Sequence, residues 1–130
     1  TIPLSKQSQE LIKSLYQIRV STVVFPNISN GKSLSQAGMS SVIKRIFSKK
    51  EWCDIYGRPI TVHGFRGTFR TWTAEKTDAD WLTGEMALAH KIKDKAASPY
   101  LKGELMEKRR RLNQSYSDFA YSLIKTNITS

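Results

Sequence analysis

The sequence predicts a mainly helical protein with a remnant of β structure at its start. Apolar residues repeat at helical spacing in several segments, most clearly over residues 39–47 and again over residues 105–123. Only one short run, residues 22–25, combines β-branched and aromatic side chains. The 130 residues are 39% apolar and 25% charged, which is typical of a globular domain. A chain of this length buries roughly two-thirds of its unfolded surface, enough for a hydrophobic core.

The first third of the chain predicts one helix between two extended pieces. Residues 2–4 resemble the end of a strand, and Ser5 is a suitable N-cap for the helix that follows. That helix places Leu11, Ile12 and Leu15 on one face. Residues 22–25 predict a short extended piece that Pro26 ends. The turn-forming residues 26–31 form the most flexible segment.

The middle of the chain predicts two further helices. Ser35 can cap the first of them, whose apolar stripe is Met39, Val42, Ile43, Ile46 and Phe47. Its opposite face carries Lys44 and Arg45. Residues 52–60 form a loop broken by a glycine and a proline. The next helix starts at residues 61–63, and we expect it to turn Phe65, Phe69 and Trp72 to the core.

The remainder predicts a fourth and a fifth helix. Asp78 or Asp80 begins the fourth helix, which ends before His90 and has Trp81, Met86 and Leu88 as its apolar residues. We expect Trp52, Trp72 and Trp81 to belong to the core. The last helix spans residues 104–124, with an apolar face of Leu105, Leu112, Tyr116, Phe119 and Leu123.

The charge of the chain indicates a polyanionic partner. There are 21 Lys and Arg residues against 11 Asp and Glu residues, a net charge of +10. Two basic segments, residues 31–70 and 91–111, enclose an acidic one, residues 71–90. Such an excess most often serves nucleic acid, although solubilising charge is the ordinary alternative. Within the basic segments we expect four residues to contact DNA phosphates: Lys44, Arg45, Lys91 and Lys93.

Several other kinds of protein are excluded by composition. Cys53 is the single cysteine, so no internal disulfide framework or multi-cysteine zinc site forms. The two histidines and this cysteine lack metal-ligand spacing, and no glycine-rich phosphate loop is present. We therefore expect no metal and no cofactor. No apolar run reaches membrane-spanning length, and the start is no signal peptide.

Four residues could together carry chemistry on a phosphate. His63 and Arg66 lie three residues apart, which in a helix places both on one face. An arginine fork binds two phosphate oxygens, and a histidine exchanges a proton near neutral pH. His90 and Tyr100 follow, with lysines around them. Taken singly, each has an ordinary structural explanation: a surface arginine beside a helix-start histidine, a helix C-cap and a half-buried tyrosine.

Taken together, these residues resemble a known family. The segment from His63 to Trp72, HGFRGTFRTW, resembles the H-x-x-R box of the tyrosine recombinases, the phage-integrase family, and Glu85 to His90, EMALAH, resembles its next box. Tyr100 stands at the position of the family's nucleophile. Residues 103–112 are similar to integrases of prophages and genomic islands, and residues 2–5 resemble the end of the family's β-hairpin. The resemblance covers almost the whole chain.

The resemblance implies a fold, a reaction and a partner. Residues 1–130 would be the C-terminal portion of a tyrosine-recombinase catalytic domain, a helical bundle with a remnant of a small sheet. The chain opens without Met, and the family's first arginine, its hairpin lysine and its DNA-binding domains would precede Thr1. We therefore expect residues 1–130 alone to be inactive or very slow. The full-length protein would act on double-stranded DNA as a homotetramer, in a bacterial cytoplasm or encoded by a phage there.

The resemblance also assigns a role to each residue. Tyr100 would attack a DNA phosphodiester and form a 3′-phosphotyrosyl link, so rejoining needs no ATP. A phenol has a pKa near 10, so it needs a base, for which His63 is the candidate. Arg66 and His90 would stabilise charge on the non-bridging oxygens in place of a metal.

Two departures and three alternatives accompany this interpretation. Gly67 stands where many members have histidine, and Pro99 directly precedes Tyr100. The first alternative is a DNA-binding module, a degenerate recombinase that no longer cleaves. The second is a type IB topoisomerase, which uses the same chemistry without site specificity. The third concerns the last helix, which could pack on its own domain or pass to a neighbouring subunit.

Overall fold

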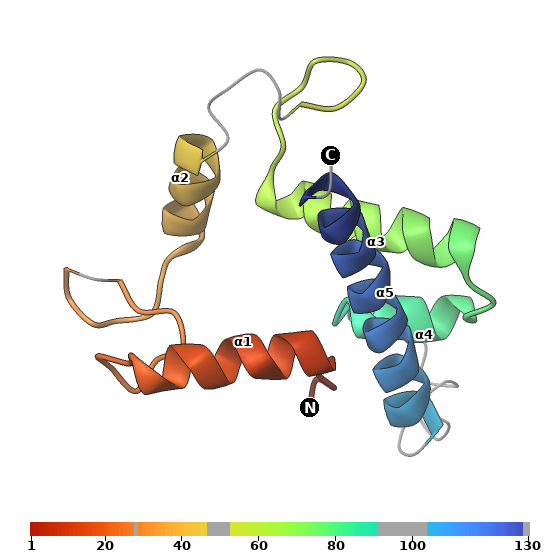
Figure 1. Ribbon diagram of the computed structural model, residues 1–130, viewed down its shortest axis with the longest axis horizontal. Helices are drawn as coiled ribbons and strands as arrows, with labels where there is room; N and C mark the ends of the chain where they lie inside the picture. Colours follow the sequence, from red (N-terminus) through yellow and green to blue (C-terminus); the bar gives the residue numbers. More distant parts are fainter. Residues whose placement is uncertain (28, 47–52, 91–103, 129–130) are drawn as a thin grey trace. The chain divides into compact units, whose positions relative to one another are not determined.

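The computed structural model describes residues 1–27, 29–46, 53–90 and 104–128, and the side chains of the last helix from Leu105 to Ile124. This part of the chain is mainly helical, as predicted (Figure 1). The helices are α1 (Lys6–Gln17), α2 (Gln36–Ile46), α3 (Val62–Lys76), α4 (Trp81–Ala87) and α5 (Glu104–Ile128). The chain divides into two compact units. Residues 1–11 and 69–130 form the α5 unit, and residues 12–68 form the α2 unit.

Short polar side chains begin most of the helices. Ser5 Oγ accepts a hydrogen bond from the Ser8 amide at 3.2 Å, and Ser35 Oγ accepts one from the Gly38 amide at 3.0 Å. Each bond satisfies a backbone N–H that has no partner inside its helix. Both predicted caps are therefore confirmed.

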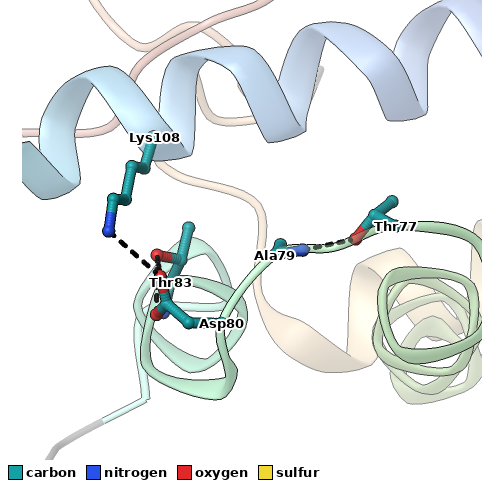
Figure 2. A network of polar contacts seen from close by, with 5 residues as sticks. All are labelled: Thr77, Ala79, Asp80, Thr83 and Lys108. Carbon is teal, nitrogen blue, oxygen red and sulfur yellow. Dashed lines mark hydrogen bonds and ion pairs between the residues drawn. The ribbon is translucent and has the colours of Figure 1, made fainter.

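Asp80, rather than Asp78, begins α4. Its carboxylate accepts hydrogen bonds from the Thr83 amide at 2.8 Å and from the Thr83 hydroxyl at 2.9 Å. Lys108 Nζ of α5 lies 3.3 Å from the second oxygen, as Figure 2 shows. Thr83 is almost fully buried beneath this cap. The network therefore joins the start of α4 to α5.

The core of the α5 unit is small and aromatic. Phe69, Leu88 and Leu112 are buried, and Trp72 and Tyr116 pack against them. The Tyr116 ring makes T-shaped contacts with Phe69, with centroids 4.9 Å apart, and with Trp72, with centroids 5.1 Å apart. Loss of water around the Tyr116 phenol raises its pKa above the ordinary 10.0. The predicted core positions of Phe69, Trp72, Leu112 and Tyr116 are confirmed.

Residues 1–7 bind along α5, and the residues before α1 form no strand. Asn113 Nδ2 donates to the Pro3 carbonyl at 2.8 Å, and Gln114 Oε1 accepts from the Lys6 amide at 2.9 Å. The hydroxyls of Ser5 and Ser117 lie 2.8 Å apart. The Pro3 carbonyl thus bonds to a side chain of α5 rather than to a neighbouring strand. The predicted strand end at residues 2–4 is therefore wrong for the described chain.

β structure is limited in the described residues to two isolated bridges, Pro26 with Ser33 and Cys53 with Pro59. Residues 22–25 run through bends rather than an extended piece, so that prediction is wrong. The turn after Pro26 is present as predicted, because the Gly31 amide donates to the Asn27 carbonyl at 2.8 Å. Gly31 has a φ of 66°, which a residue without Cβ adopts at low cost.

Several apolar residues that we expect in the core are exposed. Phe65 is 51% exposed and Trp81 is 66% exposed, so both predictions are wrong. Trp81 is the first residue of α4, and that short helix turns Thr83 and Glu85 inward instead. No residue of α2 is buried, although its apolar stripe lies at the predicted positions. Phe47 and Trp52 lie outside the described residues.

Helix α5 begins where predicted and extends four residues further, to Ile128. Leu105 and Leu112 are buried, whereas Phe119 and Leu123 are exposed. The first part of the apolar face is therefore buried in its own unit. The later part is more exposed, although the Phe119 ring still contacts Trp72 with centroids 5.7 Å apart.

The Asp80 cap predicts a change of stability with pH. Burial raises the pKa of the Asp80 carboxyl, but the hydrogen bonds from Thr83 and Lys108 outweigh burial, so the pKa lies below the ordinary 3.8. A carboxyl group whose pKa is lower in the folded state stabilises the fold at pH values above its pKa in the unfolded state. This stabilisation is lost as the pH falls through the pKa of the folded state. Asp80→Asn keeps a good N-cap but removes the proton linkage. Its free energy of unfolding should fall less steeply than that of the wild type below about pH 4.

Urea unfolding at a series of pH values measures this difference. Asp78→Asn, at the exposed neighbour, is the matched control and should follow the wild-type curve. Equal acid slopes for wild type and Asp80→Asn would contradict the assignment.

Candidate functional site

His63 and Arg66 lie near the start of α3. The Gly64 amide donates to Thr61 Oγ1 at 3.0 Å, and this bond caps a helix that begins at Val62. His63 is exposed and Arg66 is half-buried. Their spacing places them one turn apart on one face of α3, as predicted. Both residues belong to the α2 unit.

A hollow of about 670 Å³ lies beside the other face of this helix start, along Gly64, Phe65 and Thr68. Asp54 and Arg58 line it from the preceding loop. The Arg58 amide donates to the Asp54 carboxylate at 2.9 Å and Arg58 Nε at 2.7 Å, and these bonds hold the pKa of Asp54 below its ordinary value. His63 and Arg66 do not line this hollow.

His90 follows a distinct ending of α4. The Ala89 amide donates to the Met86 carbonyl and the His90 amide donates to the Glu85 carbonyl, both at 3.0 Å. Ala89 between them has a φ of 55°, in the left-handed region. This is the Schellman pattern of helix termination, in which Leu88 is the C-cap and His90 stands two residues beyond it. The prediction that the helix ends before His90 is confirmed.

The imidazole of His90 binds a buried carboxylate. His90 Nδ1 lies 2.6 Å from Glu85 Oε2, and Arg70 Nε of α3 lies 3.2 Å from Glu85 Oε1. Glu85 is 9% exposed, whereas Arg70 is largely exposed. Each carboxylate oxygen therefore has a partner, which a buried charge requires.

Glu85 and Arg70 lie within the two sequence boxes, and the sequence alone indicates a role for neither. A Schellman ending brings the residue two past the C-cap against the residue three before it. A glutamate five residues before a histidine at a helix end is therefore a signal that could have identified the pair.

The remaining predicted site residues are distributed over the chain. Lys44 and Arg45 are exposed in the last turn of α2. Tyr100, Lys91 and Lys93 lie outside the described residues. His90 belongs to the α5 unit, whereas His63 and Arg66 belong to the α2 unit, and each unit is described by itself. The gathering of all four catalytic candidates around one phosphate thus stays a prediction.

The basic run on α5 is largely engaged within its own unit. Lys108 pairs with Asp80, and both Arg110 and Arg111 pair with Glu107. Arg109 is 7% exposed, and its Nη2 donates to the Thr1 carbonyl at 3.1 Å. Arg109 therefore has a structural role.

The described residues, 1–27, 29–46, 53–90 and 104–128, contain no group of three or more His, Cys, Asp or Glu side chains that could hold a metal ion. They also contain no helix with the length and apolar character that a membrane crossing requires.

No protein-family model, no curated protein and no solved structure matches the chain.

The left-handed Ala89 predicts an unusual effect of glycine. The left-handed conformation costs an L-residue with a Cβ roughly 1–2 kcal/mol. Glycine avoids that cost but loses more conformational entropy on folding. Ala89→Gly should raise the free energy of unfolding by about 0.5–1 kcal/mol. Urea unfolding measures the change. The control Ala74→Gly, at an exposed position inside α3, should lower it by about 1 kcal/mol. A destabilised Ala89→Gly variant would show that the backbone at residue 89 is not left-handed.

Proposed function

We propose that the chain is the catalytic part of a site-specific tyrosine recombinase of the prophage or genomic-island integrase type. The observation that carries the proposal is the contact between the two sequence boxes. Arg70 comes from the box that begins at His63, Glu85 and His90 come from the next box, and Glu85 joins the other two. Two segments that resemble one family in sequence thus share one polar network.

The proposed reaction exchanges one phosphodiester for another. The phenolic oxygen of Tyr100 attacks a backbone phosphorus after His63 has taken its proton. A bond forms between tyrosine and the 3′ phosphate, and the 5′ oxygen leaves as a hydroxyl after it takes up a proton. Attack by a 5′ hydroxyl on the phosphotyrosine reverses these steps and joins the strands, so the energy of the bond is kept.

Charge on the non-bridging oxygens grows in the transition state. Arg66 offers a permanently charged planar fork to these oxygens, and His90 offers an N–H donor. These donors act in place of a metal ion in the proposed mechanism. Loss of one preorganised donor typically slows such a step by about 100-fold to 1000-fold.

Double-stranded DNA is the proposed partner because of the charge of the chain. The net charge of +10 favours a polyanion, and the exposed Lys44 and Arg45 can contact phosphates without reading bases. The exposed apolar residues near the end of α5, among them Phe119 and Leu123, suit the exchange of this helix between subunits of a tetramer on DNA. The proposed setting is the DNA of a bacterial host.

A covalent adduct tests the proposal. The protein expressed from its complete gene is incubated with a DNA duplex that carries the recombination site and a nick beside it. After cleavage the short strand with the 5′ hydroxyl dissociates, so the covalent adduct cannot be reversed. The wild type should form an adduct that is stable in detergent gels. Tyr100→Phe should form none, because the nucleophilic oxygen is absent. Arg66→Ala should slow adduct formation by about 100-fold to 1000-fold.

Tyr121→Phe is the matched control, since Tyr121 is an exposed tyrosine of α5. It should form the adduct at the wild-type rate. DNA binding without any adduct would favour the binding module instead, and an adduct that persists in Tyr100→Phe would refute the nucleophile. Relaxation of plasmids that lack the recombination site would favour a topoisomerase.

A further inference from the structure

Glu85 is the most deeply buried carboxylate of the described α5 unit, and its environment is specific. The residue is 9% exposed, and an isolated charge at such a position costs several kcal/mol. Arg70 Nε at 3.2 Å and His90 Nδ1 at 2.6 Å engage one oxygen each. An acid that only forms a salt bridge can stay on the surface. The burial of Glu85 therefore indicates that its bond to His90 has a role beyond a surface salt bridge.

The hydrogen bond determines which nitrogen of His90 carries a proton. An ionised carboxylate only accepts hydrogen bonds, so the hydrogen between the two groups lies on Nδ1. The other ring nitrogen, Nε2, then lies at the opposite edge of the ring. Among the described residues Nε2 has no hydrogen-bond partner, and the ring is about one-third exposed. Nε2 is therefore the nitrogen that an incoming phosphate oxygen can reach.

The backbone fixes this arrangement. The His90 amide donates to the Glu85 carbonyl at 3.0 Å, so the same two residues are joined through main chain and side chain. The left-handed Ala89 between α4 and His90 makes this return possible. Two linkages leave the imidazole little freedom to rotate.

We propose that Glu85 is a positioning residue for phosphate binding by His90. Its carboxylate holds the proton on Nδ1 and directs Nε2 to the phosphate oxygen, and Arg70 holds the carboxylate in place. When Nε2 also carries a proton, the imidazolium stands between two anions, Glu85 and the phosphate. The phosphate belongs to the function proposed above, and this inference rests on that proposal. The orientation of the ring does not, because the contacts of Glu85 are seen without DNA.

The tautomer of His90 can be measured directly. The chain contains two histidines, so ¹⁵N NMR of the imidazoles is assigned with a single His63→Gln variant. At a pH where both rings are neutral, His90 should carry its proton on Nδ1. The exposed His63 serves as an internal reference and should show the Nε2–H form that free imidazole prefers in water. An Nε2–H form of His90 in the wild type would overturn the inference without any mutation of Glu85.

Variants separate the hydrogen bond from the charge. Glu85→Leu removes the acceptor, so His90 should change to the Nε2–H form. Glu85→Gln keeps an acceptor oxygen but no charge, so the Nδ1–H form should persist. Glu107→Leu, the same substitution at another ion-paired acid of the α5 unit, should leave the spectrum of His90 unchanged. An unchanged tautomer in a folded Glu85→Leu variant would also overturn the inference.

The adduct assay then distinguishes the two proposals. Glu85→Leu should slow adduct formation by about 10-fold to 100-fold, by analogy with the loss on removing a carboxylate that orients a metal-binding histidine. Glu85→Gln should recover part of this loss, and Glu85→Leu should add nothing in a His90→Ala background. If Glu85→Leu changes the tautomer but not the rate, the positioning role fails and the recombinase proposal stands. If the wild type forms no adduct while the tautomer follows Glu85, the recombinase proposal fails and only the orientation of the ring is retained.

Discussion

Helix α5 buries one narrow face, and the α5 unit is built around it. Leu105, Arg109 and Leu112 are each less than a tenth exposed, and Tyr116 continues their spacing of three and four residues. Each buried leucine stabilises the fold by about 1.5–3 kcal/mol. The same helix binds the backbone of the first residues through Arg109 and Asn113. The first residues of the chain and the last described helix thus meet within this unit. Phe69 of α3 and Leu88, next to α4, pack against Leu112 on the same face of α5.

The short helix α4 depends on the bonds at its two ends, and a strained residue, Ala89, follows its second end. It has seven residues, too few to be stable alone, so its two ends largely define it. Asp80 fixes the first end to α5 through Lys108, and the Schellman bonds of Ala89 and His90 fix the second. The left-handed alanine costs free energy, yet the buried Glu85 needs the His90 ring that this turn brings back to it. Local strain and charge burial are thus balanced in one turn of backbone.

Local signals in the sequence predict the helix ends well, whereas burial depends on partners that the sequence does not reveal. Ser5, Ser35 and Asp80 act as caps because a short side-chain oxygen meets nearby amides, which is a local event. Phe65 and Trp81 follow helical spacing and are still exposed, since no described segment of their own unit covers them. The Glu85–His90 pair was missed for a related reason. The turn between them is the kind that glycine usually forms, and here alanine forms it.

The ion pairs of α5 determine which basic residues of this helix are available to the proposed DNA partner. Exposed ion pairs within one helix contribute little to stability, so Arg110 and Arg111 can exchange their Glu107 partner for phosphates at small cost. Lys108 is more constrained, because its pair with Asp80 joins α5 to the start of α4. Arg109 cannot make such an exchange, because its guanidinium is buried and donates to the backbone at Thr1. In this run of four basic residues, Arg110 and Arg111 are therefore the two cations most readily offered to a polyanion. Lys44 and Arg45 in the last turn of α2 are two further exposed cations. Because phosphate contacts release counterions, DNA affinity that depends on such exposed cations falls steeply with salt. The buried Arg109 makes no phosphate contact of this kind and does not add to that salt dependence.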